Sequence, residues 1–371
     1  MARRLTRRSL IQGTAVAGAT LGTLAAGPLA SGALAAEPGN AGAVAGSGPG
    51  SSAGPGTGAG AMPPAAAPRP KFRAAVMRLP IEIPISAAAL EDTRRRNAQA
   101  MLEAIDAAMR GPGEKPKLLV FPVLPLTSSR RAVSGVPMSA VAVDLVSQPL
   151  DKTYFAPVIE ACRRHDLLIA TSTQEKVPQL PGVYFHTGFV MGPQGLVLRS
   201  PKSQAQSAPE VSYLRDLQKD YVRIFGPDSI LPVADTKLGK VACYVEAEAQ
   251  VLEAARLFAS KGAEMILHTS LEEDEVPWMA LKQAIGFQCH VFLLTATTSR
   301  FRRADRAEPE WAGGASTIVG PDGQVLAQLG GRDEGAAAAE IDLGEIAKAK
   351  QKFARNTVPA WWLYSDLYRA R

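Results

Sequence analysis

Two side chains that can attack or deprotonate a substrate lie three residues apart near the end of an apolar run. Cys243 falls within the run Val241–Val245, and Glu246 follows it directly. A cysteine thiolate is a strong nucleophile, whereas a carboxylate acts more often as a base. Because residues three apart in a strand point to opposite faces, only one of the two can face a given site.

Further ionisable residues lie close to these two in the sequence. Glu246, Glu248 and His268 together could hold a metal ion, although a histidine at a strand end is more often a polar core residue. The acidic run Glu272–Glu275 is expected to be a solvated loop. Cys162, Cys243 and Cys289 have no metal-ligand spacing and are odd in number, so we expect structural thiols. No metal or cofactor site is predicted.

The elements that position these residues form an alternating pattern. Short apolar, β-branched runs alternate with longer helical stretches, which predicts an α/β layered architecture. The expected strands are Ala74–Met77, Leu118–Phe121, Leu167–Thr171, Thr187–Met191, Leu196–Leu198, Val241–Val245, Met265–His268, Val291–Thr295, Ser316–Val319 and Gln324–Leu326. The expected helices are Ala87–Met109, Asp151–His165, Ala249–Lys261 and Pro277–Gln288.

Two predicted hairpins share one design. Phe189–Leu198 and Thr317–Leu326 each turn on a Pro-x-Gly signal, flanked by apolar residues. This similarity predicts a fold with two related halves.

The segment Leu119–Thr127 resembles the first signature of the carbon-nitrogen hydrolase (nitrilase) superfamily, a buried strand that runs into Phe-Pro-Glu. Val123 stands where the family has Glu, its general base. Other landmarks follow in the family's order: Asn97, the hairpin Phe185–Gly195 with His186 at an Asn position, the hairpin Ser316–Gly323, and Asp366-Leu367-Tyr368 near the end.

The family's nucleophilic Cys is followed by an acid, Glu, Arg and Gly at fixed offsets. With Glu246 in the Cys position, these offsets hold Glu248, Glu253, Arg256 and Gly262, whereas with Cys243 in that position none matches. Glu246 is therefore expected to replace the nucleophile. Lys202 is the match for the remaining member of the triad, and we expect it to pair with Glu246.

These substitutions change the chemistry that the resemblance implies. Val123 cannot transfer a proton, and an intermediate formed by Glu246 would expel that carboxylate more readily than an amine. The sequence therefore predicts a binding or scaffold protein for an unknown small amide-like or nitrile-like ligand. The alternative is an active amidase-like hydrolase that uses Cys243 or a non-standard Glu246 site. The resemblance also implies a four-layer αββα sandwich and a homodimer or higher homo-oligomer.

The first seventy residues indicate export. Residues 1–35 contain Arg7-Arg8 and end in a small-residue cleavage pattern, which resembles a twin-arginine signal peptide. Residues 36–70 form a Gly/Ala/Pro linker, and 71–371 are expected to be one domain with a C-terminal arm. We expect a periplasmic or extracellular protein without a membrane span after processing.

Charge gives little support for nucleic-acid binding. The 371-residue chain has a formal charge of +6. Four arginines of the leader, which has no acid, account for most of it, so removal of the leader leaves +2. A nucleic-acid partner is therefore not expected.

Overall fold

The computed structural model describes residues 70–123, 136–147, 154–203, 211–272 and 275–353. The first strand begins at Lys71, where the folded part was predicted to start. The predicted signal peptide, nearly all of the predicted linker, and the C-terminal residues from 354 lie outside the described residues. Their predicted roles stay predictions.

The first sheet has six strands in the order β15-β1-β3-β4-β5-β6. The central strands β1, β3 and β4 are parallel, and the outer strands pair antiparallel. Its strands are β1 (Lys71–Arg78), β3 (Leu118–Val120), β4 (Leu168–Lys176), β5 (Tyr184–Gly192), β6 (Gly195–Pro201) and β15 (Gly335–Asp342).

The second sheet repeats this arrangement in the order β7-β8-β9-β10-β13-β14. Strands β8, β9 and β10 are parallel and the outer strands are again antiparallel. Its strands are β7 (Ala234–Thr236), β8 (Gly239–Val245), β9 (Met265–Ser270), β10 (Phe292–Thr297), β13 (Ser316–Val319) and β14 (Val325–Leu329). The hairpins β5–β6 and β13–β14 both contain a register shift, at Val190/Met191 and Ile318/Val319. The matching strand order agrees with the prediction of two related halves.

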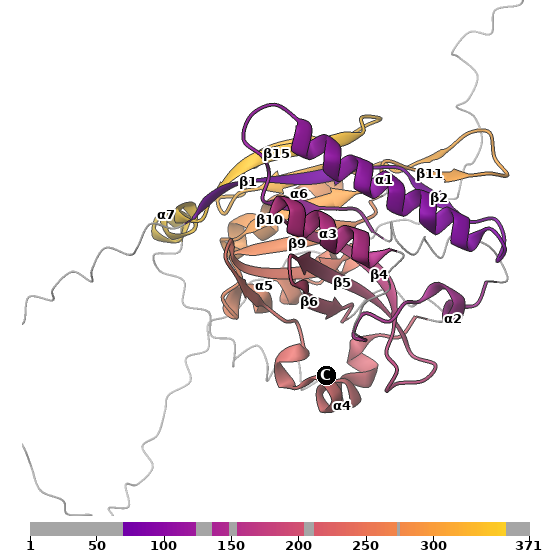
Figure 1. The fold of residues 1–371 in the computed structure, drawn as a ribbon. Coiled ribbons are helices and arrows are strands. Elements are labelled where there is room, and N and C mark those ends of the chain that lie inside the picture. Colours follow the sequence, from indigo (N-terminus) through magenta and orange to yellow (C-terminus); the bar gives the residue numbers. More distant parts are fainter. Residues whose placement is uncertain (1–69, 124–135, 148–153, 204–210, 273–274, 354–371) are drawn as a thin grey trace, which may run out of the picture. The chain divides into compact units, whose positions relative to one another are not determined.

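Helices cover the outer face of each sheet (Figure 1). On the first sheet, α1 (Leu90–Arg110) and α3 (Phe155–His165) bury Met101 and Phe155. On the second, α5 (Leu252–Ser260) and α6 (Glu275–Cys289) bury Phe258 and Ile285. A separate apolar cluster fills the space between the sheets. The layers are therefore α, β, β and α, as predicted.

Several elements were not predicted. They are β2 (Ile81–Ile83), β7, β11 (Arg300–Arg303), β12 (Glu310–Trp311), β15, α2 (Met138–Val141), α4 (Leu214–Phe225), α7 (Gly344–Phe353) and the 3-10 turns Pro227–Ser229 and Glu246–Gln250. Most are short. Strand β15 is rich in alanine, which has low β propensity, and it forms because the edge of β1 needs a partner for its backbone groups.

Successive side chains of β8 point to opposite faces of the sheet, which determines the direction of Cys243. Val241 and Cys243 belong to the core between the sheets, whereas Ala242 and Tyr244 pack under the helices. The two sheets approach closely here, because a Cβ atom added to Gly188 of β5 would lie 2.7 Å from Cys243 Sγ. Cys243 is thus a packing residue of the inter-sheet core.

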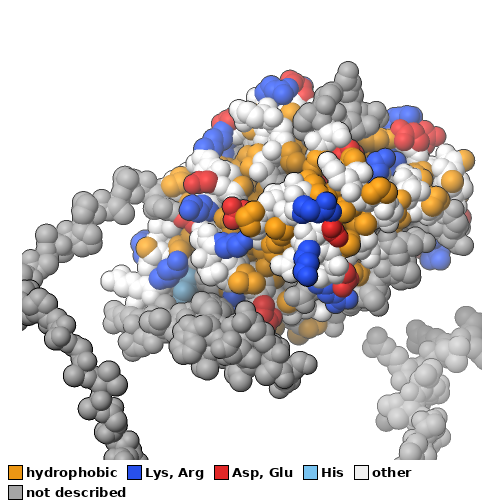
Figure 2. Space-filling view, turned by 90° about the horizontal axis from the view of Figure 1, so that it is seen from below, with side chains coloured by type: hydrophobic (Ala, Val, Ile, Leu, Met, Phe, Trp, Pro, Cys, Tyr) orange, Lys and Arg blue, Asp and Glu red, His pale blue; other side chains and the backbone are white. Residues whose placement is uncertain are grey.

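On the face shown in Figure 2, Lys and Arg side chains are interspersed with Asp and Glu side chains. Large apolar residues are exposed on α5 and α6, namely Leu257 and Phe287. The expected homo-oligomer stays a prediction. None of the described helices is both long and apolar enough to span a bilayer.

We predict that Gly188→Ala destabilises the protein by about 1–3 kcal/mol, because the new methyl group collides with Cys243 Sγ. Cys243→Ala, which removes that sulfur, should recover part of the loss in the double variant. Urea unfolding of all four proteins measures this coupling. Additive effects, within about 0.5 kcal/mol, would contradict the close packing of β5 on β8.

Candidate functional site

The predicted site residues converge where the central parallel strands end. Val123 lies three residues after β3, and Glu246 directly follows β8. Lys202 directly follows β6 of the first sheet. Open sheets of parallel strands place ligand sites at the carboxyl ends of their strands, so this edge is the natural location for one.

The carboxylate of Glu246 is the centre of the cluster. Its Oε2 accepts a hydrogen bond from Lys202 Nζ at 3.0 Å and lies 3.4 Å from His186 Nδ1. The Lys202 and His186 side chains are 8% and 5% exposed, and that of Glu246 is 25% exposed. The expected pairing of Lys202 with Glu246 is present, and it joins the two sheets.

Charge and burial set the protonation of this cluster. Burial alone raises the pKa of the Glu246 carboxyl, but the positive charges that His186 and Lys202 both carry at the low pH where this carboxyl titrates, together with their hydrogen bonds, outweigh burial and hold the pKa well below its usual range. Burial lowers the pKa of His186, despite the nearby carboxylate. His186 is therefore neutral at pH 7, with Nδ1–H directed at Glu246 and Nε2 accepting from the Ser172 hydroxyl at 3.1 Å.

The backbone of Glu246 is strained and held in place. Its φ angle is +49°, in the left-handed region that few residues other than glycine adopt. His268 Nε2 lies 3.0 Å from the Glu246 carbonyl oxygen, and Thr295 Oγ1 lies 3.1 Å from His268 Nδ1. Burial lowers the pKa of His268 to about 3, so the neutral ring donates through Nε2. His268 thus fixes the direction in which Glu246 projects.

Val123 faces an apolar environment. The side chain is buried and packs with Val245, the residue before Glu246, and with Leu271. Val123 thus packs against the residue that precedes Glu246 and supplies no ionisable group.

Glu248 is engaged elsewhere. The side chain is fully buried, and Oε1 accepts hydrogen bonds from the Ser203 backbone N–H at 2.8 Å and from the Ser203 hydroxyl. Burial raises the pKa of Glu248, and it outweighs these hydrogen bonds, which lower the pKa. Glu248 therefore holds Ser203, the residue after Lys202, in position.

Cys243 does not join the cluster. Its thiol is fully buried in the inter-sheet core, and burial strongly raises the thiol pKa. A neutral, enclosed thiol is a poor nucleophile.

The metal site considered from the sequence is not formed. His268 contacts the backbone of Glu246 rather than its carboxylate, and Glu248 is bonded to Ser203. Within the described ranges, no three His, Cys, Asp or Glu side chains are arranged to hold a metal ion.

The prediction that Glu272 is solvated is wrong. Glu272 is fully buried, and Lys282 Nζ donates to its Oε2 at 2.7 Å and to the Ala315 carbonyl at 2.7 Å. Burial raises the pKa of Glu272 and lowers that of Lys282. The sequence did not reveal this pair because Glu272 lies in the segment after β9 and Lys282 lies in α6, and each looks like a surface residue by itself.

His186 was not among the predicted site residues. Its place in the hairpin after Phe185, at a position where the family has Asn, was the available signal. Its partner Ser172 carries no sequence signal, since the contact depends on the pairing of β4 with β5.

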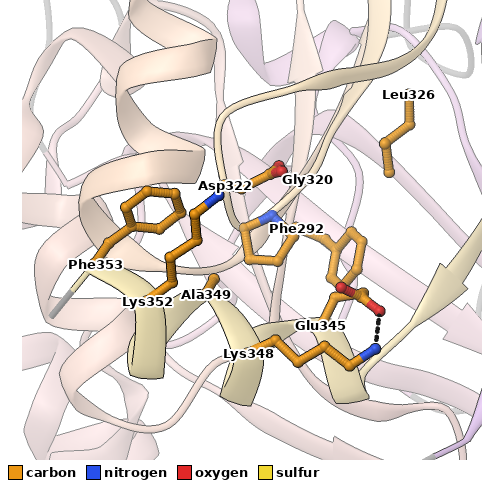
Figure 3. Close-up of a pocket in the computed structure, with 10 residues that line it drawn as sticks. Phe292, Gly320, Asp322, Leu326, Glu345, Lys348, Ala349, Lys352 and Phe353 are labelled. Atoms are coloured by element: carbon orange, nitrogen blue, oxygen red, sulfur yellow. Dashed lines mark hydrogen bonds and ion pairs between the residues drawn. The ribbon is translucent and has the colours of Figure 1, made fainter. Parts of the chain in front are cut away.

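A hollow lies at the other end of the second sheet, where β10 begins (Figure 3). It has a volume of about 320 Å³ and lies between Phe292 at the start of β10, the β13–β14 turn and α7. Within it, Lys348 is paired with Glu345, and Lys352 lies over the ring of Phe353. These groups suggest no chemistry.

The sequence matches known enzymes over part of its length. It is 30% identical over 143 residues to the bifunctional nitrilase/nitrile hydratase NIT4B of Nicotiana tabacum, covering 35% of this chain and 41% of the relative. It is 26% identical over 174 residues to the omega-amidase NIT2-A of Xenopus laevis, covering 46% of this chain and 60% of the relative. The match thus spans about half the length of these relatives.

Solved structures match over most of the fold. Nit3 of Saccharomyces cerevisiae, a nitrilase superfamily member, superposes with a TM-score of 0.59 at 18% identity, over 77% of this chain and 96% of that one. A carbon-nitrogen hydrolase of Helicobacter pylori G27 gives 0.58 at 18% identity, over 80% and 98%. These likenesses show the fold. The carbon-nitrogen hydrolase family model matches residues 73–351, and the chain therefore belongs to the carbon-nitrogen hydrolase family.

Proposed function

We propose that this protein is an exported member of the family that does not hydrolyse amides or nitriles by the family's Glu-Lys-Cys mechanism and acts as a binding or scaffold protein. The observation that carries the proposal is the contact of Lys202 with the Glu246 carboxylate. At the position where the resemblance implies a thiolate, the chain has a paired anion.

The surroundings of Glu246 favour a structural use of that anion. Its negative charge is held by Lys202 and His186 rather than left free for attack. Val123, at the expected position of the base, is buried and packs with Val245 and Leu271. General acid–base catalysis typically contributes about 10² to 10⁴ in rate, and Val123 cannot supply it.

The second candidate is a working hydrolase. Cys243 is poorly suited to be its nucleophile, because the thiol is enclosed between the sheets. Glu246 is better suited, because a quarter of its side chain is exposed and its carboxylate stays ionised. Such an enzyme would use Glu246 as a base toward water. The amidase and nitrilase names of its relatives supply the substrates to test.

We predict no turnover of amides, nitriles or carbamoyl compounds by the purified chain without residues 1–35. Product release, followed for the wild type and for Cys243→Ala and Glu246→Ala, is the measurement. Turnover lost only in Glu246→Ala would support the second candidate, whereas turnover lost in Cys243→Ala would show that the thiol is the nucleophile.

If the wild type shows no turnover, a double variant tests whether residue 246 stands at the nucleophile position. Val123→Glu combined with Glu246→Cys rebuilds the triad that the resemblance implies. The new thiol beside Lys202 should have a lowered pKa and react with iodoacetamide faster than free cysteine, as followed by peptide mass mapping. Cys243 should stay unmodified in the same folded protein. An unreactive thiol at 246 would contradict the placement of this residue at a nucleophile position.

Export is the part of the proposal that rests on residues 1–35. Arg7 and Arg8 supply the arginine pair. In a bacterial host with a twin-arginine pathway, cell fractionation should place the full chain outside the cytoplasm and the Arg7→Lys/Arg8→Lys variant inside it. The same distribution for both would contradict this route.

A further inference from the structure

Two buried donors converge on one oxygen in the Glu246 cluster. Lys202 Nζ lies 3.0 Å and His186 Nδ1 lies 3.4 Å from Glu246 Oε2. Both donors belong to the first sheet, whereas Glu246 belongs to the second. The acceptor thus enters from the facing sheet.

The backbone of Lys202 and the ring of His186 are held by contacts that do not involve Glu246. The Lys202 backbone N–H donates to the His186 carbonyl at 2.8 Å, and the His186 ring contacts Ser172 Oγ at 3.1 Å. The Leu214 N–H also donates to the Lys202 carbonyl at 3.2 Å. These bonds fix the Lys202 backbone and the His186 ring, so both residues would stay at this place if the Glu246 side chain were removed.

Lys202 and His186 are already placed to bind an anion, so an anion could bind with little movement of their backbone. An ammonium and a neutral imidazole N–H, both almost fully buried, offer charge and a hydrogen bond to the same oxygen. Without an anion, the ammonium of Lys202 would be buried and unpaired, which is strongly unfavourable. The site therefore selects for a negatively charged occupant.

We propose that Lys202 and His186 form a binding site for a small monocarboxylate, and that Glu246 fills this site from within the chain. A free carboxylate such as acetate then binds only when the Glu246 side chain is absent. This inference rests on the proposed function, because it makes Glu246 a permanent occupant rather than a reacting group. In the native protein Glu246 therefore keeps a free carboxylate away from Lys202 and His186.

The backbone at residue 246 offers a suitable variant. Glycine adopts the φ of +49° without the steric cost that Glu246 carries. Glu246→Gly therefore removes the carboxylate and relieves strain in one step, and the relief offsets part of the cost of leaving Lys202 unpaired. Glu246→Ala serves as a second variant that lacks the side chain but keeps the strain. Glu246→Gln is the matched control, because its amide oxygen still occupies the site.

The test is thermal unfolding at pH 7 in sodium acetate or in sodium chloride of equal concentration. Acetate at about 100 times its dissociation constant should raise the Tm of Glu246→Gly by roughly 5 °C relative to chloride. Glu246→Ala should show the same acetate effect. The wild type, Glu246→Gln and the double variant Lys202→Met/Glu246→Gly should show no difference between the two salts.

Three results would overturn the inference: equal stabilisation of Glu246→Gly by both salts, equal stabilisation of the wild type by acetate, or persistence of the acetate effect without Lys202. Isothermal titration of acetate into Glu246→Gly should agree with the Tm shift. Hydrolysis by the wild type would contradict the proposed function and would leave the acetate result intact, so the two failures are distinguishable.

Discussion

The ammonium of Lys202 is almost completely withdrawn from water, and a charge in that position needs an anion within reach. Glu246 supplies this anion from the other sheet, and so the pair ties the ends of β6 and β8 together. Two further contacts join the two sheets near this pair. Ser203 donates to Glu248, and Cys243 packs against Gly188. The position of one sheet relative to the other at this edge thus depends on the need of Lys202 for an anion and on the close packing of Cys243 on Gly188.

A second buried charge cluster occupies the same edge. Glu272 and Lys282 pair after β9, and the guanidinium of Arg78, which ends β1, donates to the carbonyls of Thr298 and Ala312. Buried ion pairs seldom add much net stability, but they are costly to break, because the remaining partner would be buried alone. The apolar core between the sheets fixes how they stack, while the charged residues at their carboxyl ends restrict the register in which they meet.

The sequence predicts the layers well because they depend on local patterns. Apolar runs predicted the central strands, and the Pro-x-Gly turns predicted the two matching hairpins. The Lys202–Glu246 pair was also predicted, since the motif spacing assigned both positions to one site.

The remaining features depend on tertiary contacts that no local pattern carries. Strand β15 forms from an alanine-rich segment because β1 needs a partner. Burial of Glu272 requires Lys282 from another element, and the contact of His186 with Glu246 requires the two sheets to meet. The role of His268 depends on the left-handed backbone of Glu246, which the sequence does not indicate.

The functional interpretation of this site requires Glu246 to be an anion held by Lys202 and His186. A pH titration of the Glu246 side-chain carboxyl by ¹³C NMR tests it directly, with Glu246→Gln to assign the resonance. We expect a pKa well below the usual value of about 4.3, and a higher pKa in Lys202→Met, because the ammonium favours the ionised form. A pKa at or above about 4.3 in the folded wild type would show that Lys202 and His186 do not stabilise the ionised form of Glu246.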